Sequence, residues 1–262
     1  MSAEPLTFSV LGHRIGYSAS PAMMAAAFSA LGLPHRYVVA DVSEENLAEA
    51  VDLLRDEGFG GANVTAPHKV AVAALVDSRS PDAERAGAVN TIVKHGSRLI
   101  GHNTDLPSLV EAVQRLRPNG VGAAVVLGAG GAARSVALAL EVAGATSVTL
   151  LARSDGTWAE MPDRLAGADI VVNATPIGTQ GDESPVSAAL LRPALAVLDL
   201  VYRPSPTRLV REARAAGAKA EAGGGVLLGQ GRRSLELWLG VPAPLDAMAR
   251  GLRTELGPDA DV

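Results

Sequence analysis

Short apolar runs alternate with segments of helical period along most of this 262-residue chain. The first three runs cover residues 6–11, 36–40 and 61–65, and a helical pattern follows each of them. This alternation is typical of strands joined by crossover helices in a mainly parallel sheet. Residues 88–94 and 98–102 instead flank a His-Gly-Ser turn, as the strands of a hairpin do. The sequence therefore predicts an α/β fold.

Three helix starts in the first half of the chain are expected from their capping residues. Ser20 suits an N-cap with Pro21 in the first helical position, and Gly32 closes that helix. A second helix is expected to open at Ser43 and a third at Pro67. Each helix would carry the chain from one strand to the next.

A cluster of helix-breaking residues, Arg-Pro-Asn-Gly at 117–120, divides the pattern into two halves. The alternation begins again at residue 123, and 48% apolar residues are enough for two modest cores. We therefore predict two lobes with their boundary at this cluster. The polar tail after the last helix is expected to be disordered.

Composition excludes several classes of function. The formal net charge is −5, whereas domains that bind a nucleic-acid backbone are basic, so we predict no nucleic-acid partner. The absence of cysteine rules out disulfides, thiolate metal sites and cysteine nucleophiles. The five histidines show no metal-binding spacing, so no metal site is predicted. Since neither a signal-peptide pattern nor a membrane-length apolar run is present, we expect a cytoplasmic protein with no membrane partner.

The sequence VVLGAGGAARSV places a glycine-rich turn between an apolar strand and a helix. Gly128 permits a tight turn, Gly130 lets a pyrophosphate approach the backbone, and Ala133 lets the helix pack closely on the strand. Unpaired N–H groups at the start of the helix then face the phosphates. We favour this interpretation over a turn used only for packing, because strand, turn and helix occur in the required order. The predicted cofactor contacts here are Gly128, Ala129, Gly130, Gly131 and Ala132.

The residue that follows the second strand of such a domain selects the cofactor. Here that strand ends in LLARS, which places Arg153 and Ser154 where NAD-binding proteins carry an acid. A guanidinium and a hydroxyl suit the 2′-phosphate of NADP, so we favour NADP over NAD. Asp155 keeps NAD open, because a shift of one residue would bring its carboxylate to the ribose. The other alternative is that Arg153 is an ordinary solvated arginine.

Polar residues gather at the ends of the predicted strands of the first lobe. In a parallel sheet these ends meet at the carboxyl edge, where ligands bind. A pocket rich in hydroxyl and amide groups suits a polyhydroxylated substrate. The residues are Ser18, Ser20, Asn63, Thr65, Lys69, Asn90, Thr91, Asn103 and Asp105.

Eight segments of the chain resemble shikimate dehydrogenases. They are SASP, NVTAPHK, GAVNT, GHNTD, VLGAGGAARS, NATPIG, LDLVYRP followed by Thr207, and GGVLLGQG. They occur in the family's order between residues 8 and 240, so the resemblance covers nearly the whole chain. The combination of NVTxPxK and NTD with a glycine turn further along is specific.

The resemblance implies reversible, NADP-dependent oxidation of shikimate to 3-dehydroshikimate by a two-lobed α/β protein. Residues 1–105, rejoined by helices at about 226–256, would bind the substrate, and residues 118–225 would form a Rossmann-type NADP domain. Lys69 and Asp105 would be the catalytic pair. The other implied contacts are Ser18, Ser20, Asn63, Thr65, Asn90, Tyr202 and Gln230 for the cyclic hydroxy-acid, and Asn173, Thr175 and Pro176 for the cofactor.

Elementary chemistry supports the role that the resemblance gives to Lys69. The chain has only three lysines against twenty arginines. An amine can give up and regain a proton, as oxidation of an alcohol and its reversal require, whereas a guanidinium stays protonated. Asp105 would hold the amine in place. Helix capping is the alternative role for Asp105 and for Ser20, and both roles can coexist.

Several departures from the family pattern leave the exact substrate open. Met24 and Ala25 stand where the family usually has histidine and asparagine, Ser108 replaces a glycine, and the segment 157–165 is shortened. Quinate or an aminated shikimate analogue is therefore an alternative substrate. A non-catalytic, NADP-responsive regulator is the alternative from another class, against which the presence of both catalytic candidates argues. A homodimer is left open, because the sequence carries no signal of oligomeric state.

Overall fold

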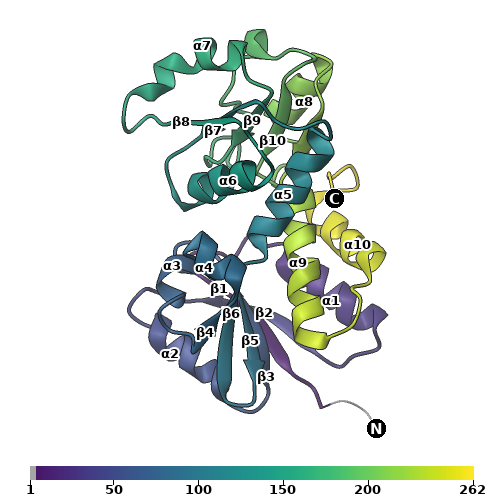
Figure 1. Cartoon of the computed structure of the whole chain (residues 1–262). Coiled ribbons are helices and arrows are strands. Elements are labelled where there is room, and N and C mark those ends of the chain that lie inside the picture. The colour runs from purple at the N-terminus through teal and green to yellow at the C-terminus, as the bar shows by residue number, and fades with distance from the viewer. Residues whose placement is uncertain (1–3) are drawn as a thin grey trace. The chain divides into compact units, whose positions relative to one another are not determined.

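The computed structural model describes residues 4–262, and their contacts divide the chain into two compact units (Figure 1). The first unit runs up to Asp105 and includes Leu228–Glu255. The second comprises Leu106–Leu227 and Leu256–Val262. Each unit is built on a β-sheet of its own, so the chain is an α/β protein as predicted.

The first unit contains a six-stranded mixed sheet with the order β2-β1-β3-β5-β6-β4. In this sheet β1 pairs in parallel with β2 and β3, whereas β5 runs antiparallel to β3 and β6. The β5–β6 hairpin turns at Gly96, where φ is +61°, which confirms the predicted hairpin. The strands are β1 (Thr7–Gly12), β2 (Arg36–Asp41), β3 (Phe59–Val64), β4 (Ser78–Arg79), β5 (Thr91–His95) and β6 (Arg98–His102).

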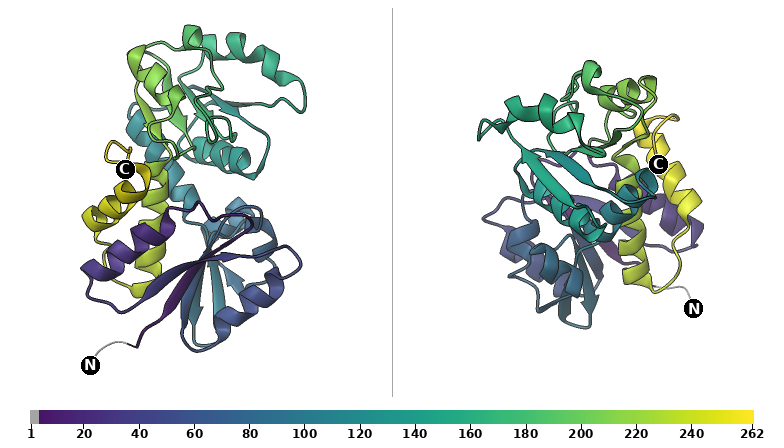
Figure 2. Two further views of the ribbon diagram at one scale, coloured as in Figure 1. Left: turned by 180° about the vertical axis from the view of Figure 1, so that it is seen from behind. Right: turned by 45° about the horizontal axis from the view of Figure 1, so that its top comes forward.

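Helices from both ends of the chain pack together in the first unit, as both views of Figure 2 show. A Cβ at Gly251 would lie 2.5 Å from the Ala22 carbonyl oxygen, and one at Gly231 would lie 2.2 Å from Met23 Cε. The two glycines therefore let these helices approach closely. The helices are α1 (Ser20–Ala30), α9 (Gly224–Leu239) and α10 (Leu245–Leu256), together with α2 (Leu47–Asp52), the 3-10 helix Leu53–Arg55, α3 (Lys69–Val72) and α4 (Pro81–Ala86).

The predicted N-cap of α1 is wrong by one residue. The helix begins at Ser20 itself, and Ala19 in the cap position supplies no side-chain hydrogen bond. Instead Ser18 Oγ accepts a hydrogen bond from the Ser20 N–H at 3.3 Å. Both Ser18 and Ser20 carry a hydroxyl that could cap this helix end, and in this backbone conformation the Ser18 hydroxyl accepts the hydrogen bond. At the other end, Gly32 has a φ of +66° and closes the helix as predicted.

The predicted starts of α2 and α3 are also wrong. A turn that is closed at Ser43 by a backbone hydrogen bond of 3.2 Å precedes α2, which begins at Leu47. A turn over residues 65–68, closed by a hydrogen bond of 3.0 Å, contains Pro67, and α3 begins at Lys69. Serine and proline favour turns as well as helix starts, so residue type alone does not distinguish the two.

The second unit contains a five-stranded parallel sheet with the order β11-β10-β9-β7-β8. Since β7 lies between β8 and β9, the strand order reverses there, and ligands bind beside such a reversal. This arrangement confirms the Rossmann-type prediction. The elements are β7 (Ala123–Leu127), β8 (Ser147–Leu151), β9 (Ile170–Asn173), β10 (Ala196–Asp199), β11 (Ala220–Ala222), α5 (Asp105–Leu116), α6 (Gly131–Val142), α7 (Met161–Ala166), α8 (Arg208–Ala215) and the 3-10 helices Thr157–Glu160 and Ala188–Leu190.

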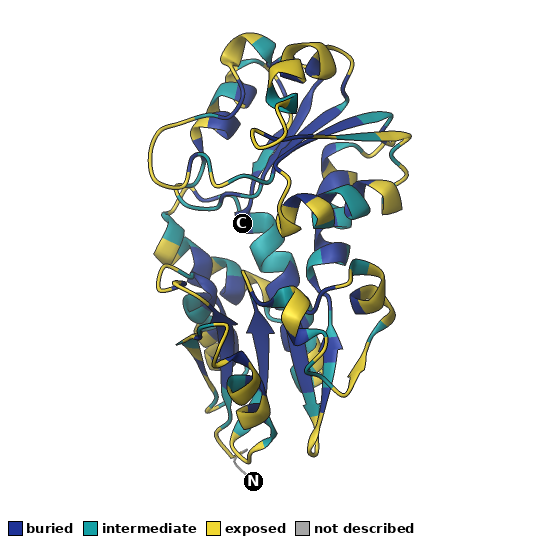
Figure 3. Ribbon diagram, turned by 90° about the vertical axis from the view of Figure 1, so that its left-hand side faces the viewer, coloured by how far each residue is buried: buried dark blue, intermediate teal, exposed yellow. Residues whose placement is uncertain are grey.

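Helices cover both faces of this second sheet, and successive strand residues enter different cores (Figure 3). Val125 packs in the core that contains Leu165 of α7, whereas Val126 packs in the core that contains Leu116 of α5. Strands buried on both faces are apolar at successive positions for this reason. Because α5 packs on the second sheet, the predicted boundary at 117–120 lies inside the second unit.

The helices keep one face toward water (Figure 3). In α5, for example, Leu109 and Val113 are buried while Gln114 and Arg115 are exposed. Across residues 4–262, no helix combines the length and the apolar character that crossing a membrane requires.

The C-terminal tail, residues 257–262, packs on the second unit. The Asp261 carboxylate accepts hydrogen bonds from Arg214 Nη2 at 2.7 Å and from the Ala222 N–H at 3.1 Å. Ala260 is buried. The predicted disorder of the tail is therefore wrong, because one carboxylate and one small apolar side chain dock a segment that looks unstructured by composition.

Candidate active site

Lys69 and Asp105 come together in the first unit. Lys69 Nζ donates a hydrogen bond to Asp105 Oδ2 at 2.8 Å. The side chains are 34% and 19% exposed, so a ligand can reach both. Lys69 is the first residue of α3, and Asp105 is the first residue of α5. The fold thus brings an amine and a carboxylate from two helix starts into direct contact.

Hydrogen bonds fix the backbone on both sides of this pair. The Lys69 carbonyl oxygen accepts from the Val89 N–H at 2.8 Å. The next residue, Asn90, donates through Nδ2 to Thr104 Oγ1 at 2.9 Å and accepts at Oδ1 from the Thr104 N–H at 2.7 Å. Thr104 precedes Asp105, so peptide bonds and hydrogen bonds form a closed loop from Lys69 to Asp105 and back. This loop holds the amine and the carboxylate in place without a ligand.

Asn63 lies in a buried hydrogen-bond network of the same unit. Its Nδ2 contacts Asn90 O, Thr91 Oγ1 and Ser234 Oγ at 3.2, 3.1 and 2.8 Å, and its Oδ1 accepts from the Tyr37 phenol at 2.8 Å. Both N–H groups of this amide are therefore used by the protein. A contact between Asn63 and a substrate, which stays a prediction, would therefore use the second lone pair of Oδ1 rather than an N–H group.

The same network reaches two other residues predicted to bind the substrate. The Ser20 side chain lies beside the Tyr37 phenol, and Ser234 Oγ donates to the Gln230 carbonyl oxygen at 2.9 Å. Burial raises the pKa of Tyr37 well above its ordinary value, so the phenol stays neutral and remains a donor. Neither Tyr37 nor Ser234 was predicted to matter for the site.

Ser18 and Thr65 lie at the ends of the loops after β1 and β3. Both are partly buried, and the Thr65 N–H donates to the Leu11 carbonyl oxygen at 2.8 Å. A Cβ at Gly12 would lie 2.6 Å from Thr65 Cγ2. Gly12 therefore makes room for the Thr65 side chain beside the end of β1.

In the second unit, the glycine turn has the geometry that dinucleotide binding requires. Gly128 has a φ of +120°, and a Cβ there would lie 3.1 Å from the Ala174 carbonyl oxygen. A Cβ at Gly130, by contrast, would meet no atom within 4 Å, and residues 129–132 are exposed. No side chain caps α6, so its first N–H groups are left for a ligand. Ala133 is buried where the helix packs on the sheet, as predicted.

Asn173 ends β9, and Thr175 and Pro176 follow in the loop that lies against the glycine turn. Asn173 Oδ1 accepts from the Thr175 hydroxyl at 2.7 Å and from the Thr175 N–H at 3.0 Å. Asn173 Nδ2 donates to Asp199 Oδ1 at 2.8 Å. The Asn173 side chain therefore shapes the loop, whereas Thr175 and Pro176 are accessible to a ligand.

Asp199, which was not predicted as a site residue, organises the loops around it. Its carboxylate also accepts from the Val201 N–H at 3.0 Å and from Thr207 Oγ1 at 2.7 Å. Burial raises the pKa of Asp199, and its hydrogen bonds oppose that rise. A carboxylate at the end of the apolar run AVLDL was the available sequence signal. Tyr202, which follows shortly after, is half-buried and belongs to this second unit.

Arg134 adds a positive charge beside the glycine turn and was also not predicted. It lies in the first turn of α6, and its Nη1 donates to the Ala129 carbonyl oxygen at 3.5 Å. Cations are unfavourable at this end of a helix, which was the signal in the sequence. Arg153 and Ser154, which were predicted, are exposed after β8.

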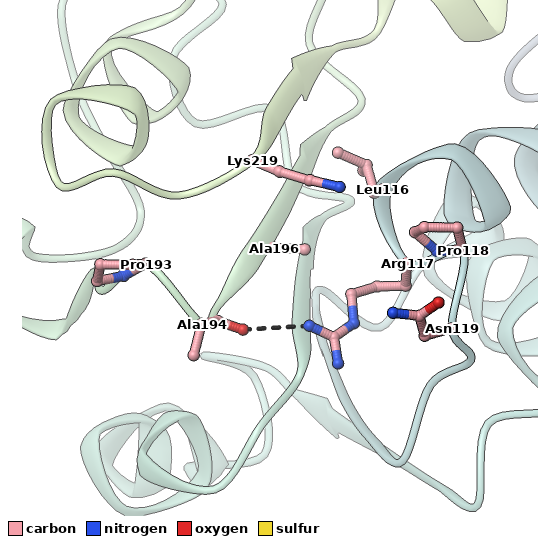
Figure 4. A pocket seen from close by; sticks show the side chains of 8 residues that line it. All are labelled: Leu116, Arg117, Pro118, Asn119, Pro193, Ala194, Ala196 and Lys219. Atoms are coloured by element: carbon pink, nitrogen blue, oxygen red, sulfur yellow. Dashed lines mark hydrogen bonds between the residues drawn. The ribbon is translucent and has the colours of Figure 1, made fainter.

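A separate pocket lies at the opposite edge of the second sheet (Figure 4). It encloses about 170 Å³ and is lined by Leu116, Arg117, Pro118, Asn119, Pro193, Ala194, Ala196 and Lys219. Arg117 donates to the Ala194 carbonyl oxygen at 3.3 Å and to Asp169 Oδ1 at 2.9 Å. Since Ala196 begins β10, this pocket faces the amino ends of the strands, whereas the glycine turn follows the carboxyl end of β7. The pocket is therefore not part of the predicted dinucleotide site.

Two family models match the chain. The shikimate dehydrogenase substrate binding domain matches residues 10–92, and the shikimate 5'-dehydrogenase C-terminal domain matches residues 223–253. A protein of Symbiobacterium thermophilum named shikimate dehydrogenase (NADP(+)) is 43% identical over 269 residues, which cover 91% of this chain and 90% of the relative.

Solved structures give the same result. Shikimate 5-dehydrogenase from Thermus thermophilus, in complex with NADP(H) and shikimate, has a TM-score of 0.86 and 39% identity, covering 96% of this chain and 100% of that one. Quinate dehydrogenase from Corynebacterium glutamicum, in complex with NAD, has a TM-score of 0.84 but 27% identity, covering 95% and 99% of the two chains. The fold is shared by both, and the sequence is more similar to the first. Together with the family models and the curated relative, these matches show that the chain belongs to the shikimate dehydrogenase family.

Proposed function

We propose that this protein is an NADP-dependent shikimate dehydrogenase, which oxidises shikimate reversibly to 3-dehydroshikimate. The observation that carries the proposal is the 2.8 Å contact between Lys69 Nζ and Asp105 Oδ2 beside a group of hydroxyl and amide side chains. The relative with 43% identity is named for this activity and this cofactor. Because the chain carries both members of an acid–base pair, the proposal favours an enzyme over a regulator.

Lys69 moves the proton of the reacting hydroxyl in this mechanism. In the oxidation direction, the free amine of Lys69 accepts the proton, and Asp105 stabilises the ammonium that forms. In the reverse direction, the ammonium returns the proton to the ketone oxygen. The closed loop of hydrogen bonds keeps Nζ in one place in both directions, so little reorganisation accompanies the transfer.

The substrate contacts are proposed from the family resemblance together with the hydrogen bonds of the first unit. Asn63 could contact the substrate only as an acceptor, because both of its N–H groups are used. Asn90 donates one N–H to Thr104 and keeps the other for a ligand. Within the first unit, the proposed contacts to the carboxylate and hydroxyls of shikimate are Ser18, Ser20, Thr65, Asn90 and Gln230.

The second unit fits NADP. When bound, the cofactor supplies the nicotinamide that takes the hydride from the alcohol carbon. The open space over Gly130 and the N–H groups of α6 suit the pyrophosphate, and Arg153 and Arg134 supply positive charge. Asp155, whose carboxylate could bind the ribose of NAD, already accepts hydrogen bonds from Thr157. The first unit would thus bind the substrate and the second would bind NADP.

A cytoplasmic location and a homodimer remain predictions. Sedimentation analysis would test the homodimer.

Replacing Lys69 with Ala tests the proposal. Turnover should fall by about 100-fold or more, as expected for a lost proton-transfer group, while NADP binds as before. Lys219→Ala is the matched control, because Lys219 is an exposed lysine on the pocket of the second unit. Turnover is followed by NADPH absorbance and NADP binding by calorimetry. Turnover of the Lys69 variant within a few-fold of the control would remove the proposal.

A substrate panel tests the alternatives. Met24, which stands where the family usually has histidine, is fully buried, so this departure alters the packing of α1 rather than an exposed contact. We therefore expect shikimate to be preferred over quinate and an aminated shikimate analogue, each measured with NADP and with NAD. Oxidation of quinate but not of shikimate would identify the protein as a quinate dehydrogenase. No absorbance change with any substrate would favour the regulator.

A further inference from the structure

The loop that follows β8 begins beside the glycine turn. β8 pairs with β7, and the Gly128 N–H donates to the Leu151 carbonyl oxygen at 2.8 Å. At this point dinucleotide-binding domains contact the ribose of the cofactor's adenosine. Residues 153–156 of the loop are exposed, and two of them, Arg153 and Asp155, carry opposite charges.

Asp155 is held by the loop itself. Its Oδ1 accepts hydrogen bonds from the Thr157 hydroxyl at 2.7 Å and from the Thr157 N–H at 3.1 Å, and these bonds lower the pKa of the carboxyl. Thr157 Oγ1 accepts in turn from the Ala152 N–H at 2.9 Å. Gly156, with a φ of +80°, lets the chain turn back for these contacts. One oxygen of the carboxylate that would bind the ribose of NAD is therefore already hydrogen-bonded within the loop.

Arg153 has a different environment. Its guanidinium carbon lies 5.0 Å from the centre of the Trp158 ring, which is within the range of a cation–π contact. Among residues 4–262, Arg153 forms no hydrogen bond and no ion pair. The ring thus restrains the guanidinium while all five of its N–H donors stay available to a ligand.

Trp158 can restrain Arg153 because the ring is itself anchored. It is half-buried and packs against the core on one face of the second sheet, which contains Leu151, Met161 and Leu165. Leu151 is the last residue of β8, two positions before Arg153. The end of β8 therefore lies close to Arg153 in sequence and belongs to the core against which the Trp158 ring packs.

We propose that Trp158 determines cofactor specificity by holding Arg153 in position for the adenosine 2′-phosphate of NADP. The inference rests on the proposed function, in which NADP binds to the second unit. NAD carries a hydroxyl in place of this phosphate and gains nothing from the guanidinium. Without the ring, Arg153 would sample many rotamers and lose that freedom on binding, which weakens its contact with the phosphate. Trp158 is thus a positioning residue that acts through Arg153.

The test compares two ligands that differ only in the 2′-phosphate, adenosine 2′,5′-bisphosphate and 5′-AMP, by titration calorimetry. Trp158→Leu removes the ring but keeps an apolar side chain for the core. We expect the Kd of the bisphosphate to rise about five-fold, which corresponds to about 1 kcal/mol at 1.4 kcal/mol per ten-fold. The Kd of 5′-AMP should stay within about two-fold of the wild-type value. Trp158→Phe, with a smaller ring, should fall between Trp158→Leu and wild type.

A second pair of variants tests whether the ring acts through Arg153. Arg153→Met should weaken bisphosphate binding by about 10- to 100-fold, because it removes a charged hydrogen-bond donor. Adding Trp158→Leu to this variant should weaken binding no further. The proposal is overturned by an equal rise for both ligands, by no rise, or by an additional five-fold loss in the double variant. Equal affinity of the wild-type protein for both ligands also overturns it.

The outcome can be separated from a failure of the proposed function. Calorimetry with these nucleotides needs no shikimate, so specificity for the bisphosphate can persist in a protein without turnover. Conversely, a protein that oxidises shikimate but is unaffected by Trp158→Leu would reject only this inference. Thermal unfolding checks that each variant is folded, and Trp158→Phe keeps the core filled if Trp158→Leu does not fold.

Discussion

Replacing Tyr37 with Phe perturbs the buried hydrogen-bond network of the first unit. The tyrosine is 7% exposed, and its phenol donates to Asn63 Oδ1 at 2.8 Å. The substitution leaves that oxygen buried without this donor, which costs about 1–3 kcal/mol. Ser20, whose side chain lies beside the phenol, loses a neighbouring hydroxyl as well. We expect Tm to fall by about 4–8 °C, taking a loss of about 2 kcal/mol at about 2–4 °C per kcal/mol.

The same substitution should affect one kinetic parameter more than the other. Ser20 is proposed to bind the substrate, and without Tyr37 its hydroxyl can rotate. KM for shikimate should rise about five-fold, the equivalent of one hydrogen bond of about 1 kcal/mol. The change in kcat should stay within about two-fold, because Lys69 and Asp105 bond to each other and not to these residues.

Tyr17→Phe provides the matched control, because Tyr17 is 56% exposed. Scanning fluorimetry measures Tm, and initial rates at varied shikimate concentration measure KM and kcat. The control should match wild type in all three. A Tm for Tyr37→Phe equal to that of the control would refute the account of Asn63 as a buried acceptor. A lower Tm with an unchanged KM would refute the substrate role of Ser20.

Three further predictions concern other parts of the chain. Gly130→Ala should leave Tm nearly unchanged, since a Cβ there meets no atom within 4 Å, yet weaken NADP binding in calorimetry. Gly128→Ala, at a φ of +120°, should lower Tm, and the reverse pattern would contradict the geometry of the turn. Asp261→Ala should lower Tm by about 2–4 °C through loss of the tail's hydrogen bonds, and an unchanged Tm would mean that the tail contributes nothing. The pKa of Asp77 is lowered to about 2, first of all by its hydrogen bond with Arg55. The ionised carboxylate therefore stabilises the folded protein above the ordinary pKa of 3.8, and this stabilisation is lost as the pH falls toward 2. Asp77→Asn should remove this part of the acid-unfolding curve, and identical curves would contradict the expectation.

The second unit could be predicted closely because its signals are local. The apolar run of β7, the glycine turn and the start of α6 lie within about a dozen consecutive residues, and each has its own physical signature. Helix starts were harder, as Ser20 illustrates. A serine suits the cap and the first turn alike, and the choice depends on the backbone at Ala19, where φ is −85° and ψ is −5°.

The pairing of Lys69 with Asp105 was predicted from the family resemblance, but the hydrogen-bond network behind it was not. Asn63 bonds to Ser234, which lies 171 residues further along the chain, and no periodicity or spacing connects positions so far apart. Tyr37 likewise reads as an ordinary apolar residue of a strand. Such contacts follow from the packing of α9 on the first sheet, and that packing is a tertiary property rather than a local one.

Asn63 and Asn90 differ in how many of their side-chain N–H groups are hydrogen-bonded to the protein. The two residues have the same side chain, and Asn63 Nδ2 even donates to the Asn90 carbonyl oxygen. Asn63 has both N–H groups hydrogen-bonded to protein acceptors, so it has no donor left for a ligand. Asn90 commits one N–H to Thr104, which fixes the loop of contacts that holds Lys69 beside Asp105, and keeps the other. In the proposed site, a substrate hydroxyl that accepts from this remaining N–H would lie near Lys69 and Asp105, whose contact is already formed.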